Sequence, residues 1–303
     1  MQNLVNTLNG FIWSNALILL ALGAGLFFSI KTKFVQIRLF KEMIRLLMSG
    51  TSSKMGISSF QALSVSLSGR VGTGNIAGVA AAIGFGGPGA IFWMWIVAFF
   101  GASTAYIEST LGQIFKEESE GQYRGGPAYY IEKAMGAKWY ALFFAVATII
   151  ATGILLPGVQ ANSIGNAAEL ALGGGEIVDT VFGPLSSTKI TTSIFVLILL
   201  AFIIFGGVKR IASFTQVVVP FMALAYIVIS LSIIGLNINR LPEIITLIIN
   251  DAFTPMAGFG AAIGWGVRRG IYSNEAGQGT GPHAAAAAEV SHPAQQGLVQ
   301  AFS

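Results

Sequence analysis

Cysteine is absent from this 303-residue chain, and charged residues make up only 10% of it. The lack of cysteine excludes disulfide bonds, thiol catalysis and cysteine-ligated metal sites. A soluble domain typically carries about 25% charged residues, so the low charge content disfavours a soluble globular fold. The first ten residues, 1–10, hold no charged side chain. A cleaved signal peptide is therefore not expected, because it needs a basic start.

Groups that could perform catalysis are also scarce. The only two histidines, His283 and His292, have no acidic or cysteine partner at metal-ligand spacing. No Ser-His-Asp constellation or cluster of acids and bases is evident, so we expect no enzyme, no cofactor and no histidine-ligated metal. A channel would need a charge ring or a repeated filter loop, and neither is evident.

The apolar content is high: 54% of the residues are hydrophobic and the mean hydropathy is +0.72. The 38 glycines favour closely packed or interrupted membrane helices. The net charge of +4 falls on a few loops, which indicates membrane topology rather than nucleic-acid binding. We therefore predict an all-α polytopic membrane protein with a single transmembrane domain over 1–303.

Apolar runs predict seven membrane segments, at 11–30, 58–83, 89–115, 139–172, 190–208, 214–236 and 254–288. The fourth is longer than a span requires, so we expect it to be tilted, or broken near Pro157-Gly158. A basic amphipathic stretch, 31–57, is expected to lie along the membrane surface. The polar loop 116–138 is expected to hold a short helix, 128–135, and an eighth segment is expected to start after Pro293.

Basic residues set the expected orientation. Twelve lie in the loops after the first, third and fifth segments, whereas the loops on the other side hold only Lys189 and Arg240. The positive-inside rule places the twelve in the cytoplasm and the N-terminus outside.

One apolar segment is interrupted by a polar, glycine-rich run, Ser68-Gly69-Arg70-Val71-Gly72-Thr73-Gly74-Asn75-Ile76-Ala77-Gly78. A helix broken within the bilayer leaves backbone N–H and C=O groups unpaired, each at a cost of several kcal/mol. Transporters use such breaks to bind a solute or ion. We therefore predict a discontinuous helix that binds a small polar solute.

The break motif has a partial copy later in the chain. Residues 75–78, Asn-Ile-Ala-Gly, match residues 274–277, Asn-Glu-Ala-Gly, and both follow glycine-rich runs that contain arginine. Five spans separate the starts of the two segments, and units of odd span number insert with opposite topology. This arrangement is typical of a five-helix inverted repeat with a discontinuous first helix. The predicted units are an extra N-terminal helix at 11–30, a first repeat at 58–236 and the start of a second at 254–303.

Three motifs, at 70–78, 86–95 and 270–277, resemble the alanine/glycine:cation symporters, also called sodium:alanine symporters. The resemblance extends over most of the chain and implies a LeuT-type fold. It implies a sodium-coupled symporter that imports L-alanine, and possibly glycine, through a prokaryotic plasma membrane by alternating access. Members of that family are longer, so the chain resembles one truncated at its C-terminus, without the last three core helices.

The residues around the break suggest how a zwitterion would bind. The N–H groups that open the second half-helix carry partial positive charge, and Thr73, Gly74 and Asn75 are placed to offer them to a carboxylate, with Gly72 beside them. The carbonyls that end the first half-helix favour a cation. On the LeuT-type pattern, Arg70 C=O and the Asn75 side chain would contact one sodium ion, and the Ser68 and Val71 carbonyls another. The alternative for the glycines is a helix-packing face.

Other polar positions complete the predicted site. By the resemblance, Gln160 would reach the substrate from a cluster that also holds Asn162, Ser163 and Asn166. Ile263, Gly264 and Gly266 are substrate candidates where a half-helix of the last segment is expected to face the first. For all of these the alternative is helix–helix contact.

Three arginines inside predicted spans, Arg70, Arg268 and Arg269, are costly in hydrocarbon unless they are paired or wet. We expect structural ion pairs, with Glu108 and Glu275 as possible partners. The expected partners of the protein are thus sodium, a small amino acid and membrane lipid, but not nucleic acid. The main alternative is a LeuT-fold cation symporter for another small solute. Sodium versus proton coupling and the oligomeric state stay open.

Overall fold

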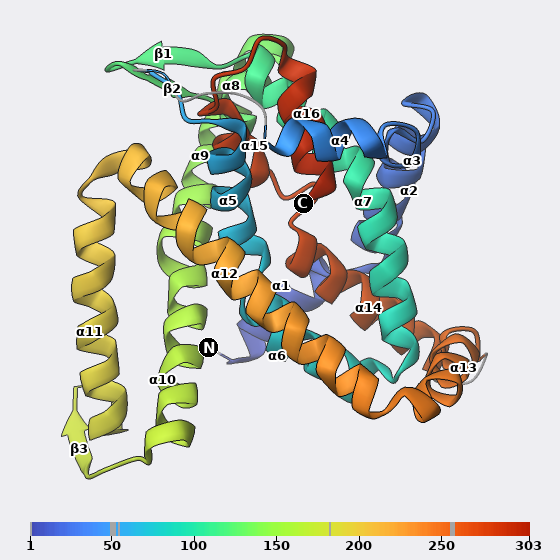
Figure 1. Ribbon diagram of the computed structural model, residues 1–303, viewed down its shortest axis with the longest axis vertical. Helices are drawn as coiled ribbons and strands as arrows, with labels where there is room; N and C mark the ends of the chain where they lie inside the picture. Colours follow the sequence, from blue (N-terminus) through green and yellow to red (C-terminus); the bar gives the residue numbers. More distant parts are fainter. Residues whose placement is uncertain (1, 49–52, 54, 182, 255–257) are drawn as a thin grey trace.

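The computed structural model describes residues 2–48, 53, 55–181, 183–254 and 258–303. It is almost entirely helical, with two short antiparallel hairpins (Figure 1). The helices are α1 (Gln2–Ile12), α2 (Asn15–Lys31), α3 (Val35–Arg38), α4 (Phe40–Leu47), α5 (Ser59–Arg70), α6 (Thr73–Gly86), α7 (Gly89–Ile114), α8 (Pro127–Met135), α9 (Lys138–Ile150), α10 (Leu156–Leu172), α11 (Ser187–Ile204), α12 (Gly207–Leu236), α13 (Leu241–Ala252), α14 (Gly258–Asn274), α15 (Gly281–Ala286) and α16 (Pro293–Phe302). The expected all-α membrane architecture is confirmed at this level.

Helix α7 has four helices, α2, α14, α15 and α16, packed along it (Figure 1). Small residues let the backbones approach closely. A Cβ on Gly25 of α2 would lie 2.9 Å from Phe100 Cβ, and a Cβ on Gly266 of α14 would lie 2.6 Å from Trp93 Cβ. Such small-residue contacts are the usual means of packing helices in membranes.

Five apolar helical stretches are long enough to cross a bilayer: Asn9–Lys31, Gly89–Ile114, Lys138–Leu172, Ser187–Ile204 and Gly207–Leu236. The other two predicted segments, 58–83 and 254–288, are each divided into two helices in the described residues: α5 with α6, and α14 with α15. Five of the seven predicted segments thus hold a continuous helix of spanning length, and the other two are the ones that contain the repeated Asn-x-Ala-Gly run.

The fourth span is not broken at Pro157-Gly158. Helices α9 and α10 run on through a π-helical turn, Ala151–Leu155, that lies directly before the proline. Pro157 has no N–H to donate to the preceding turn, so one hydrogen bond of this continuous helix is missing there. In a π-turn the backbone hydrogen bonds span five residues instead of four, and such turns are common at functional sites.

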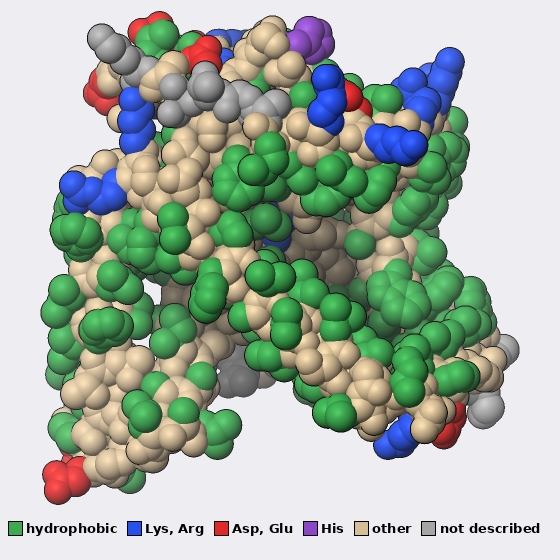
Figure 2. Space-filling model, viewed as in Figure 1, with side chains coloured by type: hydrophobic (Ala, Val, Ile, Leu, Met, Phe, Trp, Pro, Cys, Tyr) green, Lys and Arg blue, Asp and Glu red, His purple; other side chains and the backbone are tan. Residues whose placement is uncertain are grey.

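One end of the molecule gathers the basic side chains, around the hairpin of β1 (Glu117–Ser119) and β2 (Gln122–Arg124) and helices α4 and α8 (Figure 2). Neither this hairpin nor that of β3 (Ile177–Thr180) and β4 (Gly183–Ser186) was predicted. The short helix expected at 128–135 is α8, and a helix does begin at Pro293.

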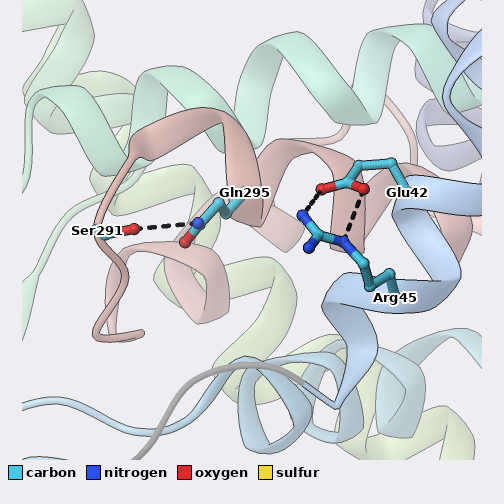
Figure 3. Close-up of polar contacts among 4 residues, drawn as sticks. All are labelled: Glu42, Arg45, Ser291 and Gln295. Atoms are coloured by element: carbon cyan, nitrogen blue, oxygen red, sulfur yellow. Dashed lines mark hydrogen bonds and ion pairs between the residues drawn. The ribbon is translucent and has the colours of Figure 1, made fainter.

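The amphipathic stretch after α2 forms two short helices at this end. Met43 and Leu46 of α4 are buried in a core with α5 and α16, whereas Lys41 and Arg45 are exposed. Arg45 Nε donates to Glu42 at 2.8 Å on the outer face of α4, and Gln295 donates to Ser291 at 3.0 Å at the start of α16 (Figure 3). The helix thus presents a charged face outward, as the periodicity predicts.

Candidate functional site

The first helix interruption lies between Arg70, the last residue of α5, and Thr73, the first of α6. Val71 and Gly72 are extended, with φ −104° and −167°. The Val71 N–H still bonds to Leu67 O at 2.8 Å, and Gly72 O accepts the N–H groups of Asn75 and Ile76. The predicted break is thereby confirmed, and it leaves the last carbonyls of α5 without intrahelical donors.

Gln160 of α10 closes the first interruption from the side. Its Oε1 atom accepts the Thr73 hydroxyl at 2.5 Å and lies 3.3 Å from the Thr73 backbone N. A Cβ on Gly72 would stand 3.2 Å from Gln160 Nε2. The amide therefore caps the N-terminus of α6, where a carboxylate is expected to bind, and glycine at position 72 makes room for it.

The second interruption runs from Glu275 to Thr280, between α14 and α15. Its backbone takes left-handed conformations at Glu275, Gly277 and Gly279, with φ of 56°, 81° and 82°. Glu108 of α7 accepts the N–H groups of Gly277 at 3.1 Å and Gly279 at 3.2 Å. A buried carboxylate thus supplies hydrogen-bond acceptors to a turn that has no helix partners.

Both interruptions border one cavity of about 530 Å³. Its lining combines residues of the first interruption, of α10 and α11, and of the second interruption: Val65, Ser66, Ser68, Gly69, Gly74, Thr152, Leu156, Pro157, Gln160, Leu200, Tyr272, Glu275, Gln278, Thr280, Gly281, His283 and Ala284. Segments that are about 200 residues apart in the sequence therefore meet at one solute-sized space, which is in the size range of ligand pockets.

The cavity includes only part of the predicted site. Ser68, Gly74 and Gln160 line it, and Gly72 and Thr73 contact Gln160. Asn75 is half-buried at the start of α6 and outside the lining, and its N–H is already bonded to Gly72 O at 3.1 Å. In the part of the chain that the structure describes, the Gly74 N–H has no hydrogen-bond partner. It is therefore the backbone donor left for a ligand.

The second half of the predicted substrate site, Ile263, Gly264 and Gly266, does not line this cavity. Ile263, Gly264 and Gly266 lie within the continuous helix α14, and the interruption comes about ten residues later. Ile263 packs with the core around Val97 and Val267, and Gly266 packs against α7. Glycine-rich sequence occurs both in broken helices and at close helix contacts, so the sequence pattern does not distinguish the two, and the structure shows a close contact at Gly266.

Glycines of α6 serve as a packing face as well. The buried small residues at four-residue spacing, Gly74, Gly78, Ala82 and Gly86, face α14. A Cβ on Gly74 would lie 2.9 Å from Tyr272 Cδ1, and one on Gly86 would lie 2.7 Å from Trp265 Cβ. The helix-packing alternative therefore holds for this face, and Gly74 belongs to both the face and the cavity.

The three intramembrane arginines are not held by carboxylates. Among the described residues, none forms an ion pair within 4 Å of a carboxylate. Arg70 donates to Gln300 O at 3.1 Å and to the Ser303 hydroxyl, and Arg268 donates to Trp13 O at 2.6 Å. Arg269 lies over the Trp265 ring at 5.4 Å. Carbonyl dipoles and a π face replace the expected ion pairs.

Sequence reasoning missed Tyr272, Gln278 and Thr280 as lining residues and assigned Glu275 only as an arginine partner. The polar density of residues 272–283 was the available signal. No group of three or more His, Asp or Glu residues that could hold a metal occurs within the described part of the chain. The cavity lining combines polar side chains, among them Ser68, Gln160 and Glu275, with apolar ones.

The sequence pattern of the sodium:alanine symporter family matches residues 1–303. Over all of its length, the chain is 57% identical to YrbD of Bacillus subtilis (strain 168), named as a candidate sodium/proton-dependent alanine carrier, and covers 61% of it. A sodium/proton-dependent alanine carrier of Bacillus sp. (strain PS3) is 48% identical over 86% of the chain and 56% of its own length. GlnT of B. subtilis (strain 168), named a probable sodium/glutamine symporter, is 44% identical over 100% of the chain and 62% of its own length.

The chain thus spans about three-fifths of the length of these relatives. The family match covers every residue and agrees with the multi-helix membrane architecture described above. On these findings, the chain belongs to the sodium:alanine symporter family, whose members are transporters and not enzymes.

Proposed function

We propose that this protein is a sodium-coupled symporter that imports a small neutral amino acid, alanine and possibly glycine, into a prokaryotic cell. The observation that carries the proposal is the meeting of two interrupted helices at one cavity of about 530 Å³. Interrupted helices place unpaired backbone groups and helix dipoles next to a solute. The names of two relatives, which describe alanine carriers, support the choice of substrate.

The substrate carboxylate would bind at the N-terminus of α6. The Gly74 N–H, the Thr73 hydroxyl and the Gln160 amide lie at or beside this end of the cavity, where the helix dipole is positive. Gln160 now bonds to Thr73, so a bound carboxylate would take over one of these contacts. This part of the site rests on described contacts.

Sodium would bind at the other side of the break. The Ser68, Arg70 and Val71 carbonyls end α5, and oxygen ligands of this kind suit hard cations. The Asn75 side chain would join the Arg70 carbonyl, as the LeuT-type pattern implies. Because a sodium ion beside the carboxylate neutralises part of its charge, binding of either would strengthen binding of the other.

The wider architecture is part of the same proposal. The inverted repeats, 58–236 and the start of a second at 254–303, would move against each other in alternating access. The twelve basic loop residues would face the cytoplasm and the N-terminus the outside.

A second candidate substrate is glutamine. The cavity of about 530 Å³ has room for a side chain longer than that of alanine, and one relative is named a sodium/glutamine symporter. The pocket lining holds further polar groups, Thr152 and Gln278, that could bond to a side-chain amide.

Uptake of radiolabelled L-alanine into proteoliposomes tests the proposal. An inward sodium gradient is compared with an equal choline gradient, and unlabelled glycine and L-glutamine are added as competitors. Alanine uptake that needs sodium supports the proposal, and stronger competition by glutamine would favour the second candidate. Alanine uptake is also measured with an inward proton gradient in the absence of sodium. Uptake driven by protons alone, or uptake independent of both ions, would contradict sodium coupling.

A further inference from the structure

Glu275 is a carboxylate that the proposed transport mechanism does not use, although it lines the cavity. It follows directly after α14, in the left-handed conformation with φ of 56°. Glycine is the usual residue at this position, because a side chain there costs conformational energy. A glutamate at such a position suggests that its side chain has a function.

The surroundings of Glu275 hold the carboxylate toward the end of α5. Its Oε2 atom accepts the Thr280 hydroxyl at 2.7 Å. A Cβ on Gly69, in the last turn of α5, would lie 2.7 Å from Oε1. The two interruptions are therefore joined at this point, and glycine at position 69 makes the close approach possible.

Negative charge accumulates at this contact. Helix α5 ends at Arg70 and α14 ends at Asn274, so the C-termini of both helices meet at Glu275. Each C-terminus carries roughly half a negative charge on its unpaired carbonyls. Two negative helix ends and a carboxylate side by side repel one another unless a cation is bound among them.

The positive charge of Arg70 acts on Glu275 only from beyond ion-pair distance. Within the described ranges, Glu275 has no ion pair within 4 Å, although five such pairs occur elsewhere. The nearest candidate is Arg70, whose Nη1 atom is directed to Gln300 O and Ser303. Its Nη2 atom lies beside Gly281, where an added Cβ would be 2.9 Å away.

We propose that the Glu275 carboxylate, with the terminal carbonyls of α5, binds a monovalent cation from the cavity. The cation is either the sodium ion or the ammonium group of the amino acid, and both use the same oxygen-rich chemistry. The cavity then has a cation pole at Glu275 and a carboxylate pole at Thr73, Gly74 and Gln160, which suits a zwitterion. The inference rests on the proposed symport and adds a binding residue to it.

The test compares wild type with Glu275→Gln, which keeps the size of the side chain and removes its charge. Binding of radioactive sodium is measured without amino acid, and sodium-driven alanine uptake is measured in proteoliposomes. A tenfold or larger loss of sodium affinity identifies sodium as the ligand. A tenfold or larger rise in KM for alanine, with sodium binding unchanged, identifies the ammonium group. If the ammonium group is the ligand, propionate, which lacks that group, should inhibit alanine uptake equally well in wild type and in Glu275→Gln.

Two further variants separate binding from folding. Thr280→Val removes the hydroxyl that holds the carboxylate and should weaken the same binding step to a smaller degree. Glu243→Gln removes an exposed carboxylate from α13 and should leave both measurements unchanged. Unchanged sodium affinity and unchanged KM in folded Glu275→Gln would overturn the inference and leave Glu275 as a neighbour of Arg70. Absence of sodium-dependent uptake by wild type would instead contradict the proposed function, and sodium binding would still be compared between the two proteins.

Discussion

The hydroxyl of Thr73 donates to Oε1 of Gln160 at 2.5 Å, and this bond joins the first residue of α6 to the middle of the long α9–α10 span. The two residues are 87 positions apart in the sequence. The contact places an amide oxygen against the positive end of a helix, where it occupies the position expected for a substrate carboxylate. A substrate carboxylate can thus replace the amide oxygen at the helix end, while the Gln160 NH2 group stays available to donate to the substrate.

Gln160→Leu should raise KM for alanine about tenfold, because the site loses a polar partner that contributes roughly 1–1.5 kcal/mol. Sodium-driven uptake at a series of alanine concentrations gives KM and the maximal rate. Asn162→Leu, on an exposed face of the same helix, is the matched control and should behave as wild type. Equal effects of the two variants would show that the cluster acts through helix packing instead.

Asn75→Ala should weaken the binding of sodium and alanine together, because the amide oxygen is proposed to contact an ion that also neutralises the substrate carboxylate. Two quantities are measured. One is the sodium concentration that gives half-maximal uptake at a fixed alanine concentration, and the other is the alanine concentration that gives half-maximal uptake at a fixed sodium concentration. Asn166→Ala, exposed on α10, is the control. If Asn75→Ala kept the sodium dependence of wild type, the shared site would be contradicted.

Gly266→Ala and Gly264→Ala should differ in stability although they are two residues apart on α14. A Cβ at 266 would lie 2.6 Å from Trp93 Cβ, so we expect a loss of about 1–3 kcal/mol from overpacking. A Cβ at 264 would meet nothing within 4 Å, and alanine favours the helix by up to about 1 kcal/mol. Thermal unfolding in detergent measures both. Equal midpoints would mean that α14 does not pack on α7 as described.

Glu108→Ala should loosen the second interruption more than Glu108→Gln does. Alanine leaves the N–H groups of Gly277 and Gly279 without an acceptor, at about 1–3 kcal/mol each, whereas glutamine keeps one oxygen. Hydrogen exchange of the peptide that contains 275–280 measures the opening of this turn. Glu243→Ala is the control, and exchange that is equal in all three variants would show that Glu108 does not anchor the turn.

The Glu42–Arg45 pair predicts a pH-dependent contribution to stability at the basic end. The hydrogen bond from Arg45, together with its positive charge, lowers the pKa of Glu42 below its ordinary value of 4.5 and outweighs partial desolvation, which raises the pKa. The contribution should therefore be present above pH 4.5 and be lost as the pH falls through the lower pKa of the folded state. The unfolding midpoints of wild type and Glu42→Gln, compared at pH 7 and below pH 4.5, test this. The small difference between the two unfolding midpoints expected at pH 7 should disappear in acid. A difference that persists in acid would contradict the predicted pH dependence.

Local patterns in the sequence predicted the membrane architecture well. Five of the seven predicted spans, the short helix expected at 128–135 and the break after Arg70 were located, because hydropathy and glycine content are properties of a short stretch of chain. The hairpins β1–β2 and β3–β4 were missed, since they form within short loops whose pairing depends on turn geometry.

The structure places only some of the predicted site residues beside the cavity. Ser68, Thr73, Gly74 and Gln160 lie at or beside the cavity, but Ile263, Gly264 and Gly266 do not. The resemblance aligned a second half-helix there, whereas the interruption lies at Glu275–Thr280. A sequence pattern does not distinguish a glycine that permits a helix break from a glycine that permits close helix contact.

The sequence by itself determined the class of protein, the apolar segments and the first interruption, because burial in lipid selects residues one segment at a time. The tertiary structure alone decided which polar groups share a space. In the folded chain, the Glu275 carboxylate lies beside Gly69, and Glu108 accepts the N–H groups of Gly277 and Gly279. Arg70 donates to the Gln300 carbonyl instead of a carboxylate. These partners are set by how helices far apart in the chain pack against one another, and short-range sequence does not encode that packing.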